Sequence, residues 1–253
     1  MPSVKSILET ARSSNATIVD LNAQSLKDVP PALFEVQSVE QLTLANNRLG
    51  EIPEDIVRLK KLENVSFFGN KLSALPKSVV SMGSLKYLTA SYNFITELPT
   101  GFGSCPNLVY LDLSCNQLKQ LTANFGFLTT LRSLHLSDNH LETLPPEIGK
   151  LVDLNTLVLC NNNITHLPAE LGNLQALRYC LLQGNKLKTI PKELANTPLG
   201  TSGTTFRAYK NPLLPFLQDV LDEGGTKGFF ALLRSDEYAA KLAEAESGKK
   251  KKK

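Results

Sequence analysis

Apolar residues along this chain recur with a period of 23 positions. Each unit follows the pattern L-x-x-L-x-L-x-x-N-x-L-x-x-L-P-x-x-I-x-x-L-x-x, and no insertion separates one unit from the next. Every L or I place of this pattern carries an apolar residue except the last one in the array, which is Thr197. The units begin at Ala16, Val39, Leu62, Leu85, Leu108, Leu131, Leu154 and Leu177.

The two halves of each unit predict different backbone structures. The segment L-x-x-L-x-L alternates between inward and outward places, which predicts a short strand with its apolar side in the core. Parallel strands need a crossover, and the L-P-x-x-I-x-x-L segment suits a 3-10 or short helical turn that begins near proline. This pattern is the leucine-rich repeat signature. It predicts an α/β solenoid with a parallel concave sheet, convex crossovers and helical caps at both ends.

The ninth place of the unit is polar throughout the array. It is Gln24 in the first unit and asparagine in the next seven, which are Asn47, Asn70, Asn93, Asn116, Asn139, Asn162 and Asn185. An asparagine amide can bond backbone groups that a turning chain leaves open. We expect each amide to bond its own unit and the next one, so that the asparagines form a ladder.

A repeat array needs a cap at each end, because a single unit has no second layer against which to bury its apolar face. At the N-terminus, apolar residues at helical spacing from Val4 to Ala11 predict an amphipathic helix over 4–13. We therefore divide the chain into a capping helix (1–15), eight repeats (16–199), a C-terminal cap (200–242) and a flexible lysine-rich tail (243–253).

Within the C-terminal cap, the period slips by three residues. Phe206, Ala208 and Asn211 resemble a truncated ninth unit. Two helices are predicted after it, over 215–223 and 227–242, with Gly224-Gly225 as the stop between them.

Charge is unevenly distributed along the chain. The formal net charge is +3, but the five C-terminal lysines exceed it, so the remainder is slightly acidic, unlike a nucleic-acid-binding domain. No apolar run is long enough for a membrane-spanning helix, and the amphipathic N-terminus predicts no secretory leader. The lysine run is a solubilising end or a weak contact for actin or another anionic surface. It consists of Lys249, Lys250, Lys251, Lys252 and Lys253.

The four cysteines predict a reducing compartment, and therefore a cytoplasmic protein. Cys105 and Cys180 occupy core places, whereas Cys115 and Cys160 are predicted to point from the sheet two units apart, about 10 Å, which is too far for a disulfide. The histidines have no metal-binding spacing, and no nucleophile has a base at a supporting spacing. We expect no catalysis, no metal and no cofactor, and a chain that is a monomer on its own.

The polar places of the strand segment form rows of neighbours across the concave face. We expect the third, fifth, seventh, eighth and tenth places to face that side. Aromatic residues gather in the central units, and aromatic residues anchor many protein interfaces. Solvent-facing strand positions also favour Tyr, Thr and Phe, which is the alternative interpretation. The candidate binding residues are Phe68, Tyr87, Tyr92, Tyr110, Asp112, His135, Asp138 and Asn161.

Two interpretations of the charged groups in this set stay open. Asp112 beside His135 is either a local ion pair or a solvated carboxylate. Asp138 is either solvated or the contact for a basic group on a partner.

Several segments carry a resemblance to a known family. The crossover pattern is similar to that of intracellular Ras-group leucine-rich repeat proteins. Residues 128–139 and 144–151 resemble the Ras-suppressor family, as do Phe206 to Ala208, Asn211-Pro212 and the cap segment Leu233 to Tyr238. The resemblance covers nearly the whole chain.

The resemblance implies a function. Members of the family are non-enzymatic adaptors that join integrin adhesions by binding the last LIM domain of the PINCH adaptor, and they dampen Ras signalling. It implies a LIM-domain partner on the concave residues and a location at cell–matrix adhesions. The alternative is a leucine-rich repeat scaffold that regulates a small-GTPase pathway or a protein phosphatase.

Overall fold

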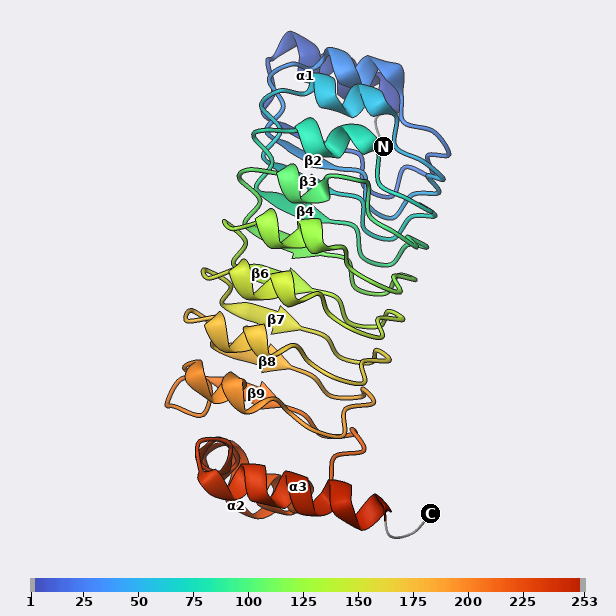
Figure 1. Cartoon of the computed structure of the whole chain (residues 1–253). Coiled ribbons are helices and arrows are strands. Elements are labelled where there is room, and N and C mark those ends of the chain that lie inside the picture. Colours follow the sequence, from blue (N-terminus) through green and yellow to red (C-terminus); the bar gives the residue numbers. More distant parts are fainter. Residues whose placement is uncertain (1–2, 251–253) are drawn as a thin grey trace.

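The computed structural model describes residues 3–250, which form an elongated stack of similar layers (Figure 1). Nine short strands make one parallel sheet in which each strand lies beside its neighbours in sequence. The predicted leucine-rich repeat solenoid is therefore confirmed. The strands are β1 (Ile18–Asp20), β2 (Gln41–Thr43), β3 (Asn64–Ser66), β4 (Tyr87–Thr89), β5 (Tyr110–Asp112), β6 (Ser133–His135), β7 (Thr156–Val158), β8 (Tyr179–Leu181) and β9 (Thr205–Arg207).

The sheet register follows the sequence period. Tyr87 on β4 pairs with Tyr110 on β5, 23 positions later, and the same offset holds from β1 to β8. The offset changes at the last pair, where Tyr179 on β8 pairs with Thr205 on β9. The three-residue slip in the sequence thus becomes a longer connection into the ninth strand.

The core lies between the sheet and the crossovers. Leu134 at the centre of β6 and Leu136 just after it are both fully buried, and the corresponding residues of the other units are buried as well. Each buried leucine side chain stabilises the fold by roughly 1.5–3 kcal/mol relative to an exposed one. The 23-residue leucine pattern therefore sets the positions of strands β1 to β8.

Short 3-10 turns form the convex side, as the apolar spacing predicts. Six of them begin directly after a proline, whose fixed φ suits the extended residue before a turn. Gly101 and Thr122 hold that position in the other two. The turns are η1 (Pro31–Glu35), η2 (Glu54–Arg58), η3 (Lys77–Ser81), η4 (Phe102–Ser104), η5 (Ala123–Phe127), η6 (Pro146–Lys150), η7 (Ala169–Asn173) and η8 (Lys192–Asn196).

Glycines at the nineteenth place let neighbouring turns approach closely. A Cβ atom on Gly149 would lie 2.4 Å from the carbonyl oxygen of Glu170, and one on Gly172 would lie 2.4 Å from that of Glu193. The first three units carry larger residues at this place. The C-terminal half of the convex side is therefore packed backbone against backbone.

The predicted asparagine ladder is present, but it points the other way. The amide of Asn139 donates to the carbonyls of Leu136 and Leu113, and its oxygen accepts from the N–H of Leu118. Leu113 and Leu118 belong to the preceding unit, so the expectation that the amide bonds the next unit was wrong. The strand and the following bend of the earlier unit leave these groups open toward the later unit, which is why the amide reaches backward.

The N-terminal cap is helix α1 (Val4–Ser13), which spans the range that the apolar spacing predicts. The hydroxyl of Ser3 accepts a hydrogen bond from the N–H of Ser6 and caps the helix start. Leu8 and Ala11 are buried against the first unit. An exposed ion pair between Arg12 and Glu35 joins α1 to η1.

The C-terminal cap consists of α2 (Pro215–Leu233) and α3 (Asp236–Lys250). The predicted interruption at Gly224-Gly225 is a kink within α2, where Gly225 has φ 56° and ψ −165°. The break between the two helices lies later, at Arg234-Ser235, and the sequence prediction missed it. This break allows Tyr238 to turn inward, where its hydroxyl donates to the carbonyl of Ile190.

Helix α3 also extends into the segment that we predicted to be a flexible tail from residue 243. Its alanine-rich sequence has a high helix propensity, which the charge-based interpretation of the tail overlooked. Residues 251–253 of the lysine run lie outside the described residues.

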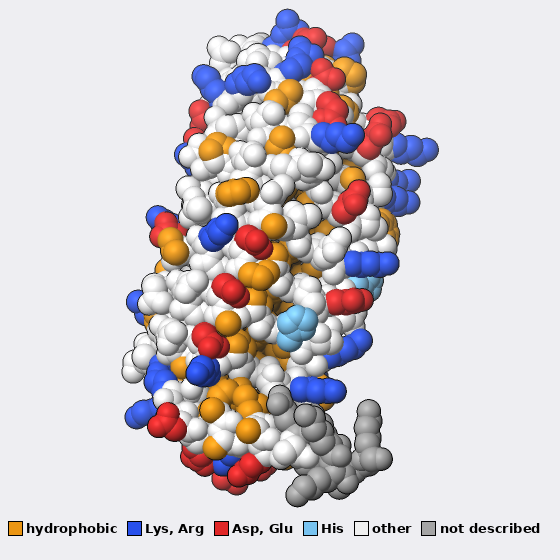
Figure 2. All heavy atoms as spheres, viewed as in Figure 1, with side chains coloured by type: hydrophobic (Ala, Val, Ile, Leu, Met, Phe, Trp, Pro, Cys, Tyr) orange, Lys and Arg blue, Asp and Glu red, His pale blue; other side chains and the backbone are white. Residues whose placement is uncertain are grey.

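Charged side chains of both signs are interspersed on the side of the molecule seen in Figure 2. This mixture matches the near-neutral body that the sequence predicts. Within residues 3–250, no helix is both long and apolar enough to cross a membrane.

Candidate functional site

The concave rows predicted from the sequence are real neighbours in the sheet. Tyr87 and Tyr110 face each other across β4 and β5, and Asp112 lies directly opposite His135 across β5 and β6. These four residues stand at the ends of their three-residue strands, while the residue between the ends is buried. The 23-residue period is therefore enough to place Tyr87 beside Tyr110 and Asp112 beside His135.

The aromatic residues form two pairs. The rings of Phe68 and Tyr92 have centroids 5.2 Å apart at 59°, and those of Tyr110 and His135 are 5.3 Å apart at 38°. Tyr92 is 59% exposed and Tyr87 is 44% exposed. The concave face thus presents large rings to solvent, although each ring in these two pairs contacts its partner ring on one side.

The eighth place of each unit has a left-handed backbone, which the sequence analysis did not foresee. Glycine, asparagine and aspartate tolerate this conformation, whereas other residues lose about 1–2 kcal/mol in it. Tyr92 and Cys115 are neighbouring exceptions in the central units. The φ angles are 55° for Ala23, 56° for Asn46, 65° for Gly69, 57° for Tyr92, 55° for Cys115, 55° for Asp138, 53° for Asn161 and 73° for Gly184.

The carboxylate of Asp112 is held in place by its own side of the sheet. It accepts hydrogen bonds from the Ser91 hydroxyl at 2.9 Å and from the Ser114 N–H at 2.9 Å. Among the side chains that the structure describes, it forms no ion pair with His135. The ion-pair interpretation of these two residues is therefore wrong, because the serine contacts turn the carboxylate away.

The imidazole of His135 forms a hydrogen bond with a different neighbour. Its Nε2 lies 2.9 Å from the hydroxyl of Ser133 on the same strand. Burial lowers the pKa of the imidazole, and the nearby Asp112 carboxylate offsets part of this effect. His135 therefore favours its neutral form and contributes little positive charge to the face.

Asp138 is exposed and accepts a hydrogen bond from the side-chain amide of Asn161 at 3.0 Å. No lysine or arginine among the described side chains lies within ion-pair distance of either Asp112 or Asp138. Both carboxylates also help to raise the pKa of the Tyr92 phenol, after the larger effect of the adjacent Cys115 side chain. The two acids and the tyrosine therefore belong to one electrostatic neighbourhood.

The cysteines are poor nucleophiles. Burial raises the pKa of Cys105 to about 11 and that of Cys180 to about 12, and it also raises the pKa of Cys115. Cys160, which we predicted to point from the sheet, is only 9% exposed, so neighbouring atoms largely cover it. Its seventh place is partly covered, as the burial of Ser91 at the same place of an earlier unit shows.

Sequence reasoning missed other exposed apolar residues. Phe94 is 51% exposed at the tenth place, two residues after Tyr92. Tyr179 occupies the third place of the eighth unit, beyond the units in which we sought a cluster. The repeat pattern could have identified both, because their places in the unit are the ones assigned to the concave side or its edge.

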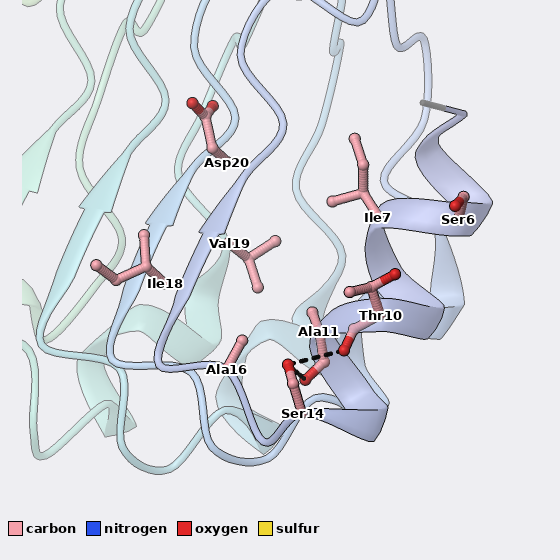
Figure 3. Close-up of a pocket in the computed structure, with 9 residues that line it drawn as sticks. All are labelled: Ser6, Ile7, Thr10, Ala11, Ser14, Ala16, Ile18, Val19 and Asp20. Carbon is pink, nitrogen blue, oxygen red and sulfur yellow. Dashed lines mark hydrogen bonds between the residues drawn. The ribbon is translucent and has the colours of Figure 1, made fainter. Parts of the chain in front are cut away.

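A hollow at the N-terminal end of the array offers little chemistry. A cavity of about 290 Å³ lies between α1 and β1, lined by Ile7, Ala11, Val19 and Asp20 among others (Figure 3). Asp20 is the only titratable side chain in its lining, so the cavity lacks the pair of groups that acid–base catalysis uses. Across residues 3–250, no three His, Cys, Asp or Glu side chains converge as a metal site would require.

Comparisons with known proteins agree with this architecture. A family model described as a leucine-rich repeat region matches residues 103–198. A leucine-rich repeat protein from Leptospira interrogans is 26% identical with a TM-score of 0.57, over 83% of this chain and 65% of that one. A search of curated proteins returns no match.

Two further solved structures extend the comparison. The leucine-rich repeat ectodomain of the receptor kinase GASSHO1/SCHENGEN3 from Arabidopsis thaliana, in complex with CASPARIAN STRIP INTEGRITY FACTOR 2, is 28% identical with a TM-score of 0.57. The match covers 74% of this chain and 26% of that one. An internalin from Listeria monocytogenes is 20% identical with a TM-score of 0.73, over 87% and 62% of the two chains, and shows likeness of fold alone. The chain thus spans less than two thirds of the length of each of these proteins.

Proposed function

We propose that this leucine-rich repeat protein is a non-enzymatic scaffold that binds a protein partner through its concave face, centred on Tyr92. One observation carries the proposal. Tyr92 holds a large aromatic ring in solvent, 59% exposed, on a left-handed backbone that suits glycine or asparagine better. The repeat imposes this backbone conformation on the eighth place of the other units as well, so the exposed ring is what distinguishes Tyr92, and tyrosine is a common interface anchor.

The chemistry of the face supports recognition rather than catalysis. Ser133 bonds His135, but the carboxylate opposite that histidine is bonded by Ser91 and Ser114 instead. The serine, histidine and aspartate are therefore not linked in the order that activates a serine nucleophile. The raised pKa of Cys115 likewise favours the thiol over the reactive thiolate.

The finer proposal is an adaptor of the Ras-suppressor type, with a PINCH-like LIM domain as the partner, acting in the cytoplasm at cell–matrix adhesions and dampening Ras signalling. Its support is the sequence resemblance, which is most specific in the C-terminal cap. In that cap, Phe206, Leu233 and Tyr238 are buried, so the resembling segments are the ones that close the array. The partner surface on this proposal is the candidate set around Phe68, Tyr92, Asp112, His135 and Asp138.

A pull-down with isolated LIM domains tests the proposal. We expect the wild-type chain to retain a PINCH-like LIM domain, and Tyr92→Ala and Asp138→Arg to lose it. Phe127→Ala is the matched control, because Phe127 is an equally exposed aromatic residue on the turn η5. Recovery of a phosphatase or a small GTPase in place of the LIM protein favours the alternative scaffold. Equal losses in Tyr92→Ala and Phe127→Ala contradict a concave site.

A further inference from the structure

Two carboxylates of the concave surface, Asp112 and Asp138, have no cationic side chain within ion-pair distance among the described residues. Asp112 and Asp138 lie in the two units that follow the unit of the exposed Tyr92. The one basic side chain directly opposite Asp112 is His135, which bonds Ser133 and stacks on Tyr110. The face therefore combines negative charge with open aromatic rings.

The two carboxylates are fixed before any partner arrives. Ser91 and Ser114 orient Asp112, and Asn161 orients Asp138. Groups that are already ordered lose less conformational entropy on binding. Tyr92 lies in the unit before that of Asp112 and two units before that of Asp138: Ser91, its direct neighbour, bonds Asp112, and Asp138 occupies the same eighth place as Tyr92.

Charge and shape together select one kind of occupant. A lysine or arginine side chain has an apolar stem that packs on aromatic rings and a cationic head that seeks carboxylates. An acidic or purely apolar segment would leave both carboxylates unpaired beside it, which is unfavourable once water is excluded.

We infer that the partner inserts a lysine or arginine side chain here, with its stem on the rings of Tyr92 and Tyr110 and its cationic head between Asp112 and Asp138. This inference rests on the proposed function, and it names the chemistry of the partner segment that occupies the site. The aromatic rings supply contact area for the inserted side chain, and the two carboxylates favour a side chain with a positive charge.

Selection of a phage-displayed library of random twelve-residue peptides on the full chain tests the inference. We expect the enriched peptides to carry Lys or Arg beside an aromatic or aliphatic residue. A synthetic copy of an enriched peptide should bind Asp112→Asn and Asp138→Asn at least about tenfold more weakly than wild type, and more weakly still at high salt. Both substitutions should preserve folding. At position 112 the asparagine oxygen can accept from the Ser114 N–H while its amide donates to the Ser91 hydroxyl, and at position 138 asparagine can accept from Asn161 and suits the left-handed backbone.

The controls separate this inference from the proposed function. Asp219→Asn, an exposed acid on α2, should bind the peptide as wild type does. Replacing the peptide's Lys or Arg with norleucine should remove binding to the same extent as Asp138→Asn. Peptides that need Tyr92 but ignore both acids overturn the cationic occupant and leave the concave site intact. An absence of enriched peptides also overturns it, whereas the LIM pull-down decides the proposed function independently.

Discussion

The ring of Tyr92 packs against the ring of Phe68 from the preceding unit, with centroids 5.2 Å apart. The left-handed backbone of Tyr92 turns its side chain toward this neighbour and still leaves 59% of it exposed. The pair is thus a supported aromatic anchor on an otherwise polar row. Its backbone strain and its ring contact oppose each other energetically.

Replacing Tyr92 with asparagine separates binding from stability. Relief of the left-handed strain gains about 1–2 kcal/mol, and loss of the ring pair costs about 0.5–1.5 kcal/mol. We expect the free energy of unfolding of Tyr92→Asn to stay within about 1 kcal/mol of wild type in urea titrations, while partner capture is lost. Loss of folding in this variant would show instead that the ring is structural.

Removing one rung of the asparagine ladder should destabilise the whole array. Asn139→Ala leaves the N–H of Leu118 without its partner in a buried region and removes one of the two amide hydrogen bonds to the carbonyl of Leu113, which costs about 1–3 kcal/mol. Gln24→Ala is the control, because Gln24 bonds only the carbonyl of Asn22, and it should change stability by less than about 0.5 kcal/mol. Similar midpoints of urea unfolding for the two variants would contradict the ladder's role.

A methyl group on the convex side distinguishes tight from open glycine positions. Gly149→Ala would push its Cβ to 2.4 Å from the backbone oxygen of Glu170, and we expect a loss of roughly 1–3 kcal/mol. Gly83 has no heavy atom within 4 Å of the same position, so Gly83→Ala should be neutral or slightly stabilising. Thermal melting of both variants measures the difference. A stable Gly149→Ala protein would mean that neighbouring turns can move apart.

Stability should depend on pH through His135. Burial lowers its pKa in the folded state, so the unfolded chain takes up the proton more readily. The contribution of His135 is complete above the unfolded pKa of about 6.5 and is lost as the pH falls through that value toward the lower folded pKa. Urea titrations between about pH 7.5 and pH 5 should show a larger loss for wild type than for His135→Gln. Equal losses would show that other groups cause the dependence.

The repeat period predicted the fold closely because one constraint recurs in every unit. Leu134, Leu136 and their equivalents must be buried, and this requirement sets strand, register and turn together. The pairing of Asp112 with His135 across β5 and β6 followed from the same period. Their lack of an ion pair did not, since it depends on hydrogen bonds from Ser91 and Ser114 that no repeat pattern specifies.

Features of single residues were harder to predict. Asn46, Asp138 and Asn161 are residue types that tolerate a left-handed backbone, so they indicated this conformation at the eighth place. We interpreted that row only as a binding surface and therefore did not predict the conformation. The burial of Cys160 depends on neighbouring side chains at the edge of the sheet. The break at Ser235 accompanies a contact that is distant in sequence, the hydrogen bond from the Tyr238 hydroxyl to the carbonyl of Ile190.

The backward reach of each asparagine gives the array a direction of assembly. During synthesis, the asparagine of each new unit can bond the open backbone N–H and C=O groups of the unit made just before it. The corresponding groups of the new unit are bonded only when the next unit follows. Asn211 is the last rung of the asparagine ladder. Across the longer final connection, its side-chain oxygen accepts from the N–H of Leu187 and its NH2 group donates to the carbonyl of Leu182. During growth from the N-terminus each new asparagine therefore finds its partners in the preceding unit already made, so these hydrogen bonds between units can form in the order of synthesis.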